Sequence, residues 1–416
     1  MQQYDYLIRG GRVIDPANGV DQVADVAIKD GVIAKIAPDI PVSQAKRIYD
    51  ARGQIVTPGL IDLHVHVYEH ATPLGINADE HCLRRGVTTV VDAGSAGYLT
   101  FPGLRRFIAE TSQCRVLALL NISSVGLAAA GLGGSDTLPG ELESLKFADV
   151  DGAQRVIEEN RDIIVGVKVR LSSNLTHDGR HEGEGLRRAL ELADRVQRPL
   201  MVHRSFSTLS HAECFGRLRA GDIYTHCYHG FASTILDPAT RRVDPAVREA
   251  YERGVVFDIG SGQGSFNWTV AELAMADGLL PFTISSDLHA GTVYGPTYDL
   301  PTVMTRLLHL GVPLADIVAM ATIRPAQVIG WDDRIGTLGV GRPADVTVLA
   351  IEDWEGELED CQSQRRRIRQ RIVARAVWRE GVHYACTVAN PWPNEQTIAR
   401  QRPSWEHLVI RDATRP

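Results

Sequence analysis

The sequence has 416 residues, with 44 lysines and arginines against 51 aspartates and glutamates, so its formal net charge is −7. Hydrophobic residues make up 44% and charged residues 23%, proportions that are typical of a globular protein with a large core. This mild acidity gives no reason to expect a nucleic-acid partner, and the most apolar window is too rich in glycine to predict a membrane partner. Six cysteines without a C-x-x-C pair favour a reducing compartment, so we expect a cytoplasmic protein.

Both ends of the chain carry strand patterns. Residues 1–55 alternate apolar and polar side chains in short runs broken by Gly, Pro and Asp, which is typical of antiparallel strands. A similar pattern returns in 336–351 and 371–384. We therefore predict one small β-sandwich domain built from residues 1–55 and 333–416. A short basic run indicates a solvated or interface strand, with nucleic-acid contact as a lesser alternative; its arginines are Arg365, Arg366, Arg367, Arg369 and Arg371.

The middle of the chain, residues 56–332, alternates short apolar runs with helical patterns such as 183–197 and 247–254. Eight such β-then-α units match the usual size of a (β/α)₈ TIM barrel, so the predicted fold class is α/β. A doubly wound open sheet is the alternative, but the G-x-G-x-x-G turn that it needs after a strand is missing. Glycine-rich stretches at 126–134 and 260–265 follow the third and seventh runs, and we interpret them as mobile loops. The eight runs are 58–66, 86–94, 115–123, 163–172, 198–203, 222–227, 254–262 and 281–289.

Several apolar runs end on residues that bind metals. His64 and His66 close the first run, and their spacing of two places both imidazoles on one side of a strand. His203, His226 and Asp287 close the fifth, sixth and eighth runs. Because barrel enzymes carry their chemistry at the carboxyl ends of the strands, these side chains are expected to converge on one metal site.

Lys168 lies inside the fourth run, where a charged ammonium is costly to bury. Burial lowers the pKa of a lysine, and the neutral amine can then add CO₂ to form a carbamate with two oxygens. An ordinary lysine paired with an internal acid is the alternative. The convergence of four histidines and one aspartate on the same mouth favours the carbamate.

These residues, in this strand order, resemble the binuclear amidohydrolase superfamily. The flanking motifs TPGLID, TIRPAQVIG and GTLGVGRPADVTVL agree with it, and THCYHG, GVVFDIGSGQGSFN and SSD are similar to its deacetylase branch near dihydroorotase. The resemblance implies two divalent metal ions, which we expect to be Zn²⁺, and CO₂ that converts Lys168 to N6-carboxylysine. It also implies that one metal ion is bound by His64, His66, Lys168 and Asp287, and the other by Lys168, His203 and His226.

The implied reaction is hydrolysis of an amide or ester by a metal-bridging hydroxide, with Asp287 as the catalytic base and acid. We expect a small carboxylated substrate, such as an N-acyl amino acid or an O-acyl hydroxy acid. Arg170 projects to the same side of its strand as Lys168, and it is predicted to hold the substrate carboxylate unless it pairs with Asp92 or Asp258. The other candidate substrate contacts are Tyr228 and His229, for which loop packing is the alternative.

Two other functions remain open at this point. A cyclic amidohydrolase, similar to a dihydroorotase or a hydantoinase, is the first, although Tyr68 stands where a dihydroorotase has an arginine. A scaffold without catalytic activity is the second, and the six intact ligand positions count against it. We also expect the protein to form a homo-oligomer.

Overall fold

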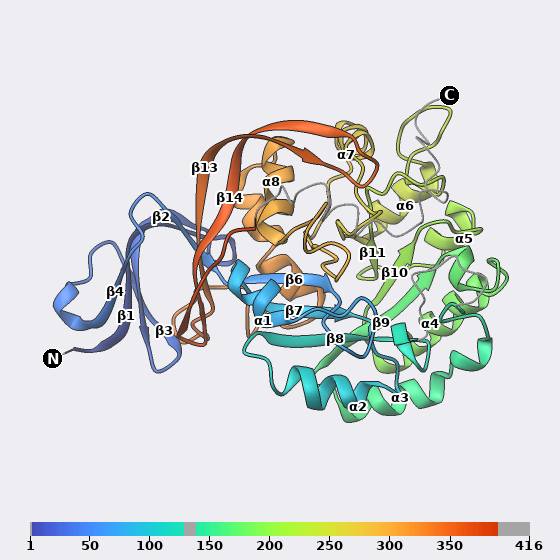
Figure 1. The fold of residues 1–416 in the computed structure, drawn as a ribbon, viewed down its shortest axis with the longest axis horizontal. Helices are drawn as coiled ribbons and strands as arrows, with labels where there is room; N and C mark the ends of the chain where they lie inside the picture. Colours follow the sequence, from blue (N-terminus) through green and yellow to red (C-terminus); the bar gives the residue numbers. More distant parts are fainter. Residues whose placement is uncertain (1, 129–138, 390–416) are drawn as a thin grey trace.

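The computed structural model describes residues 2–128 and 139–389, and these residues form two β-sheets (Figure 1). The larger core is a parallel sheet of seven strands whose order follows the chain, from β6 at one edge to β12 at the other. Each strand coincides with one of the first seven predicted runs. The strands are β6 (Leu60–Val65), β7 (Val87–Ala93), β8 (Arg115–Asn121), β9 (Ile164–Leu171), β10 (Leu200–Arg204), β11 (Ile223–Thr225) and β12 (Val256–Phe257).

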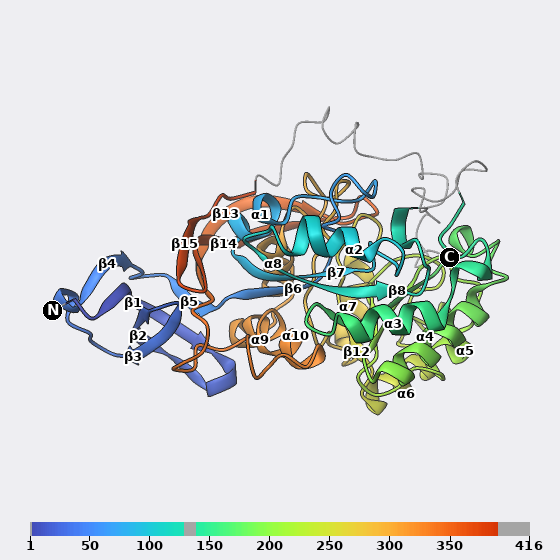
Figure 2. The same cartoon turned by 90° about the horizontal axis from the view of Figure 1, so that it is seen from below.

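Helices alternate with these strands and cover the outer face of the parallel sheet (Figure 2). The two helical patterns predicted at 183–197 and 247–254 correspond to α4 and α6. Caps fix several helix starts; Asp149, for example, accepts a hydrogen bond from Gly152 N at the start of α3. The helices are α1 (Ala78–His81), α2 (Phe101–Leu104), α3 (Val150–Glu159), α4 (Glu182–Val196), α5 (His211–Phe215), α6 (Pro245–Arg253), α7 (Trp268–Ala276), α8 (Leu300–His309), α9 (Leu314–Met320) and α10 (Ile323–Val328).

The eighth predicted run, 281–289, is not a regular strand. It makes single parallel bridges to both edges of the sheet, Asp258 with Thr283 and Val65 with Leu288. The ladder stops there because Asp287 adopts a φ of 49°, in the left-handed region, which a continuous strand cannot contain. The parallel sheet is therefore curled, with the segment 281–289 touching both of its edges.

The second sheet joins the two ends of the chain, as the sequence predicted, but as one hydrogen-bonded sheet in place of the predicted sandwich. Its order is β15-β14-β13-β5-β1-β2-β3, and β4 also pairs with β1. Strand β1 is long enough to pair in parallel with both β4 and β5, whereas the sequence pattern suggested antiparallel neighbours alone. The strands are β1 (Tyr4–Asp15), β2 (Val20–Lys29), β3 (Val32–Ala37), β4 (Ala45–Asp50), β5 (Ile55–Pro58), β13 (Val346–Glu359), β14 (Arg365–Arg379) and β15 (Val382–Ala385).

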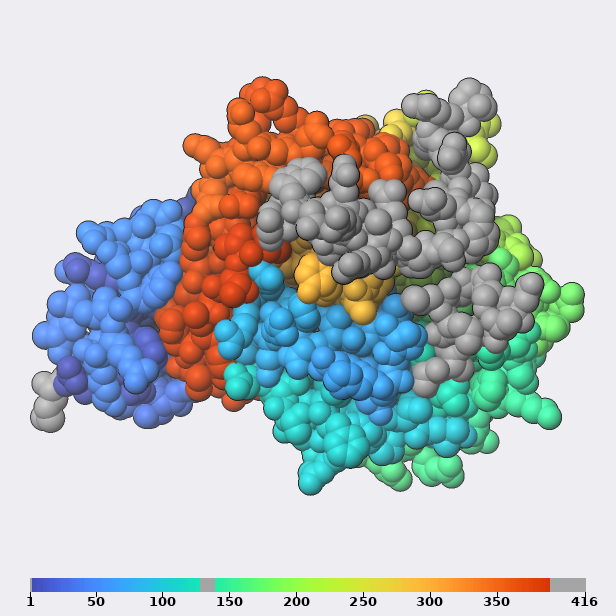
Figure 3. Space-filling view, in the orientation of Figure 1, coloured from blue at the N-terminus to red at the C-terminus, as the bar shows by residue number. Residues whose placement is uncertain are grey.

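The hairpin of β13 and β14 connects the two sheets. Its base lies in the terminal sheet, where Val348 and Trp378 are buried among the apolar residues of β1 and β2. Its far half arches over α8 towards α7, and Ile368 and Ile372 belong to the core of the parallel sheet (Figure 1). In the space-filling view the hairpin forms a red and orange band from the blue terminal sheet across the molecule (Figure 3). The hairpin therefore contributes residues to the cores of both sheets.

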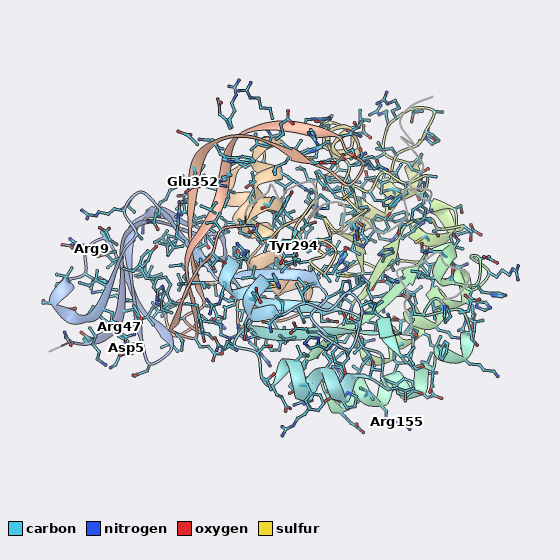
Figure 4. The ribbon with its side chains drawn as sticks, viewed as in Figure 1. Asp5, Arg9, Arg47, Arg155, Tyr294 and Glu352 are labelled. Carbon is cyan, nitrogen blue, oxygen red and sulfur yellow. The ribbon has the colours of Figure 1, made fainter. Side chains whose placement is uncertain are left out.

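The basic run predicted as a strand is part of β14, and its arginines pair with acidic residues. Arg371 donates to Glu352 on β13, and Glu352 is labelled in Figure 4. Arg366 pairs with Glu272 on α7 at 2.7 Å. Arg365 pairs with Glu359 at 3.4 Å and Arg367 with Glu355 at 3.5 Å, so ion pairs offset the charge of four of the five arginines. The strand assignment of the run is confirmed. All six cysteines are free. Within the described ranges, no helix has both the length and the apolar character that crossing a membrane requires.

Candidate metal centre

The predicted ligands meet at the carboxyl ends of the strands. His64 lies at the end of β6, and His66 directly follows that strand. Lys168 and His203 lie in the neighbouring strands β9 and β10. His226 follows β11 and Asp287 lies in the bridging segment, so the six residues come from five neighbouring places around the curled sheet; they are His64, His66, Lys168, His203, His226 and Asp287.

One group of donors surrounds Asp287. Its Oδ1 lies 3.3 Å from His64 Nε2 and 3.2 Å from His66 Nε2. Among the residues that the structure describes, these three form a group whose ligand atoms all lie within 4.8 Å of one another. Lys168 Nζ lies 3.3 Å from His64 Nε2 and is fully buried. Lys168 therefore extends this group towards the second pair of histidines.

The second group consists of His203 and His226. Their Nδ1 and Nε2 atoms lie 2.7 Å apart, and the two rings are nearly perpendicular. The other nitrogen of His226 contacts the carbonyl of Gly260 at 2.6 Å, and that of His203 contacts Ser205 Oγ at 2.6 Å. Each histidine thus has one nitrogen fixed by the protein while the other nitrogen faces its neighbour.

Hydroxyl groups hold the first pair of imidazoles. His64 Nδ1 contacts Thr225 Oγ1 at 2.9 Å, and this hydroxyl donates to Asp258 at 2.8 Å. His66 Nδ1 contacts Ser95 Oγ at 3.0 Å. Such partners fix the orientation and tautomer of a metal-binding histidine. The arrangement therefore leaves Nε2 of His64 and of His66 directed at Asp287.

Burial keeps the four imidazole donors neutral. It lowers the pKa of His66 and of His226 to about 3, and it holds the pKa of His64 and of His203 well below the ordinary value. Burial also lowers the pKa of Lys168 to about 7. A neutral imidazole has a lone pair to offer to a cation, so the chemistry of this donor set fits divalent metal ions such as zinc.

Two of the metal-binding candidates adopt a strained backbone. His226 has a φ of 64° and Asp287 a φ of 49°, values that are uncommon for residues other than glycine. Asp287 is held there because its N–H donates to the carbonyl of His64 at 2.7 Å. Such strain persists only where the surroundings fix it, and it is concentrated at functional sites.

A cavity opens beside these donors, and Arg170 lines it. The guanidinium makes a two-fold ion pair with Glu141, with Nε–Oε1 at 2.5 Å and Nη2–Oε2 at 3.0 Å. Neither Asp92 nor Asp258, the partners considered from the sequence, is the one that pairs with it. Both are buried and accept hydrogen bonds elsewhere, because Asp92 binds the backbone N–H of Val67 and Asp258 binds three hydroxyl groups.

The other candidate contacts are placed differently from Arg170. Tyr228 is fully buried, and its hydroxyl donates to the carbonyl of Leu279 at 2.8 Å. His229 accepts from the backbone N–H of Phe231 at 3.2 Å. Neither is among the residues that line the cavity, so loop packing describes both. Tyr68 does not line it either, because its hydroxyl donates to Thr100 O.

Some lining residues were not predicted from the sequence, and neither was Glu141, which pairs with Arg170 at the edge of the cavity. Phe206 and Phe231, whose ring centroids lie 4.1 Å apart, both face the cavity. His289 differs from these, because its position two residues beyond Asp287 makes it a candidate from the sequence, and it does line the cavity.

Residues 129–138 lie outside the described part of the chain. Most of the glycine-rich stretch 126–134, which was interpreted as a mobile loop, falls within them.

Metal-binding side chains at the carboxyl ends of a curled parallel sheet fit metal-assisted hydrolysis. Together with the match to the amidohydrolase family, they define the protein as a metal-dependent hydrolase that acts on C–N bonds. More narrowly, the chain belongs to the amidohydrolase family, whose model matches residues 55–365. This membership is confirmed by the relatives. The presence of all six candidate ligand residues argues against a scaffold without activity.

Three relatives illustrate the range of the family. A deacetylase of Agrobacterium fabrum is 37% identical over 341 residues, which are 82% of this chain and 81% of that protein. A solved structure of an adenine deaminase has a TM-score of 0.84 and 32% identity, and the match covers 92% of this chain and all of that one. A solved dihydroorotase has a TM-score of 0.83 and 33% identity, covering 93% and 99%.

Proposed function

We propose that the protein is a deacylase that removes the acyl group from small N-acyl amino acids or O-acyl hydroxy acids. The observation that carries the proposal is the convergence of His64 Nε2, His66 Nε2 and Asp287 Oδ1 beside a cavity that Arg170 lines. The similarity to a curated deacetylase at 37% identity supports the reaction type. The residues facing the cavity support the substrate class.

Two divalent cations, for which Zn²⁺ is our choice, would be held by the two donor groups described above. When bound, they supply Lewis acidity that polarises a carbonyl and lowers the pKa of a water molecule. We further propose that segment 281–289 acts as the eighth strand and closes the barrel. This closure would hold Asp287 opposite His64 and His66.

Lys168 is proposed to be carboxylated. Its neutral Nζ attacks the carbon of CO₂ and loses a proton, which leaves a carbamate with two anionic oxygen donors. Two observations support this modification: Lys168 is fully buried, and no described carboxylate forms an ion pair with its Nζ. A bare amine has one lone pair, whereas the carbamate offers a donor to each group of ligands.

Asp287 is proposed as the proton carrier. Its carboxylate accepts a proton from the attacking water and passes it to the departing amine or alkoxide. Ser286, the preceding residue, is bound through both N–H and hydroxyl to Asp62 at 2.9 and 2.5 Å. These bonds tie the segment to β6 and keep Asp287 close to the reacting atoms.

Arg170 is proposed to hold the substrate carboxylate. Glu141 binds one side of its guanidinium, which fixes the orientation of the group while the side chain still lines the cavity. A fixed guanidinium binds a carboxylate with a defined geometry and orients the scissile carbonyl. Phe206 and Phe231 supply an apolar side to the same cavity.

Ring opening of a cyclic amide is the second candidate, and the structural similarity to a dihydroorotase favours it. Tyr68 counts against dihydroorotate as the substrate, because its hydroxyl is bound to Thr100 away from the cavity. We therefore rank deacylation first.

The test is a substrate panel with metal-loaded protein. It contains N-acetyl amino acids and O-acetyl hydroxy acids in both enantiomers, together with dihydroorotate, hydantoins and adenine. We expect turnover of at least one acyl compound and none of the others. Turnover of the cyclic compounds alone would establish the second candidate, and turnover of adenine alone would reject both.

A further inference from the structure

The tip of the β13–β14 hairpin, residues 360–364, lies against the loops around the cavity. Cys361 N donates to the carbonyl of Phe266 at 3.1 Å, and Asp360 Oδ2 accepts from the backbone N–H of Trp268 at 2.9 Å. The same aspartate binds the backbone of Gln362 and Gln364, which folds the tip into a defined shape. The hairpin tip is thus joined to the loop that follows β12 and to the first residue of α7, which lies 92 positions earlier in the chain.

Gln362 connects two loops at once. Its Nε2 donates to the carbonyl of Gly230 at 3.1 Å, in the loop 226–234 that follows β11. Its Oε1 accepts from Asn267 Nδ2, in the loop 258–267 that follows β12. Gly230 is needed for this approach, because a Cβ at that position would lie 2.1 Å from Gln362 Oε1. The side chain therefore acts as a clamp across the two loops.

Both clamped loops form one wall of the cavity. Phe231 from the first loop and residues 263–265 from the second line it. The loops touch there, since a Cβ on Gly264 would lie 2.8 Å from the ring of Phe231. Gly260, in the second loop, accepts the contact from His226 Nδ1. The position of this wall depends on what holds the two loops together.

A buried arginine forms a second connection between the hairpin and the loop 258–267. Arg306 on α8 is fully buried and donates to Ser261 Oγ at 2.7 Å and to the carbonyl of Glu359 at 3.2 Å. Its guanidinium also lies 4.7 Å from the ring centroid of Phe266. Arg306 thus ties the end of β13 to the loop 258–267 independently of Gln362, so loss of the Gln362 clamp should loosen the wall and leave the fold intact.

We propose that Gln362 is a positioning residue that sets substrate specificity, by holding Phe231 and residues 263–265 as one wall of the cavity. The inference rests on the proposed deacylase function for its kinetic readout alone. Discrimination between a large and a small acyl substrate depends on this wall. Of the six metal-binding candidates, His226 alone lies in a clamped loop, and its contact with the carbonyl of Gly260 does not involve Gln362, so it remains when Gln362 is replaced.

The experiment compares Gln362→Ala and Gln362→Glu with Gln370→Ala in the full-length, metal-loaded protein. Gln370 is a matched control, because it is an exposed glutamine of the same hairpin whose side chain contacts Asp353 on that hairpin. The glutamate variant keeps an acceptor for Asn267 and loses the donor to Gly230, and its size is unchanged.

The first readout is amide hydrogen exchange of peptides covering 228–234 and 260–268. We expect exchange about tenfold faster in Gln362→Ala, because two hydrogen bonds across the loops are lost. Gln362→Glu should affect mainly 228–234, and Gln370→Ala neither. Unchanged exchange in both Gln362 variants would overturn the proposal, whatever the substrate is.

The second readout is the ratio of kcat/KM for N-acetylphenylalanine to that for N-acetylglycine, or for the corresponding O-acetyl hydroxy acids. We expect this ratio to fall about fivefold in Gln362→Ala with unchanged metal content. A purely structural defect reduces the active fraction and leaves the ratio unchanged, which would refute the specificity role. If the wild-type protein hydrolyses none of these compounds, the proposed function fails, and the exchange data still decide whether Gln362 is a clamp.

Discussion

The metal centre and the cavity wall beside it are built in different ways. The metal-binding candidates lie in or directly after strands β6, β9, β10 and β11 and in the segment 281–289, and each belongs to an apolar run that places it there. The wall combines loops 226–234 and 258–267 with a hairpin tip that belongs to the terminal sheet at its other end. Damage to the first region should therefore change metal content and kcat, and damage to the second should change KM and specificity.

The largest effect is expected at the metal centre, from Asp287→Asn. Asparagine retains an oxygen donor but cannot carry a proton, so kcat should fall ~10²–10⁴-fold while most of the metal stays bound. Steady-state kinetics and elemental analysis on the same sample measure both. Asp333→Asn, at an exposed position, is the control. A variant with more than about a tenth of wild-type kcat would contradict the role of Asp287.

Lys168→Ala comes next, because it removes the group proposed to join the two sets of donors. Metal content and turnover should both fall, the latter by about 100-fold or more. A short carboxylic acid such as propionate should restore part of the activity by filling the space of the carbamate. Loss of activity without loss of metal, and without rescue, would show that Lys168 does not serve as a carboxylated ligand.

Arg170→Met changes the cavity and not the metal centre. A carboxylate bound to a guanidinium contributes ~1.5–3 kcal/mol, so KM for an acyl amino acid should rise about tenfold or more while metal content is unchanged. Arg180→Met, at an exposed position, controls for the loss of charge. An unchanged KM would leave Arg170 with a structural role only, as the partner of Glu141.

The smallest of these effects is expected from Glu141→Gln. The amide retains one acceptor for Arg170, so the guanidinium should keep most of its orientation, and KM should rise about threefold. Kinetics at several substrate concentrations separate this rise from any change in kcat. If kcat changed and KM did not, Glu141 would act on the metal centre, and the division between the two regions would be wrong.

The sequence predicted more of the metal centre than of the cavity. His64, His66, Lys168, His203, His226 and Asp287 were found because each stands in a short apolar run whose geometry is local. Glu141 could not be found in this way, since its pairing with Arg170 depends on where a loop packs. Asp92 and Asp258 were the partners considered for Arg170, but Asp92 in β7 and Asp258 directly after β12 accept hydrogen bonds from other groups.

The fold shows the same division. Seven of the eight predicted strands were confirmed. They could be predicted because a parallel strand that is buried on both faces has a continuous run of apolar residues. The eighth run became a segment with single bridges, since Asp287 interrupts it with a left-handed backbone. The terminal segments were recognised as strands, but their union in one sheet was decided by the long-range antiparallel pairing of β5 with β13.

The sequence by itself therefore determined seven strands of the parallel sheet, the candidate ligands in and after them, and the chemistry that such side chains permit. Only the tertiary structure decided that Glu141 meets Arg170 and that Gln362 reaches Gly230, which is 132 positions away in the chain. The physical reason is the range of the interactions. Strand periodicity and ligand spacing are local properties of the backbone, whereas a hydrogen bond between distant loops exists only once two separate cores have packed.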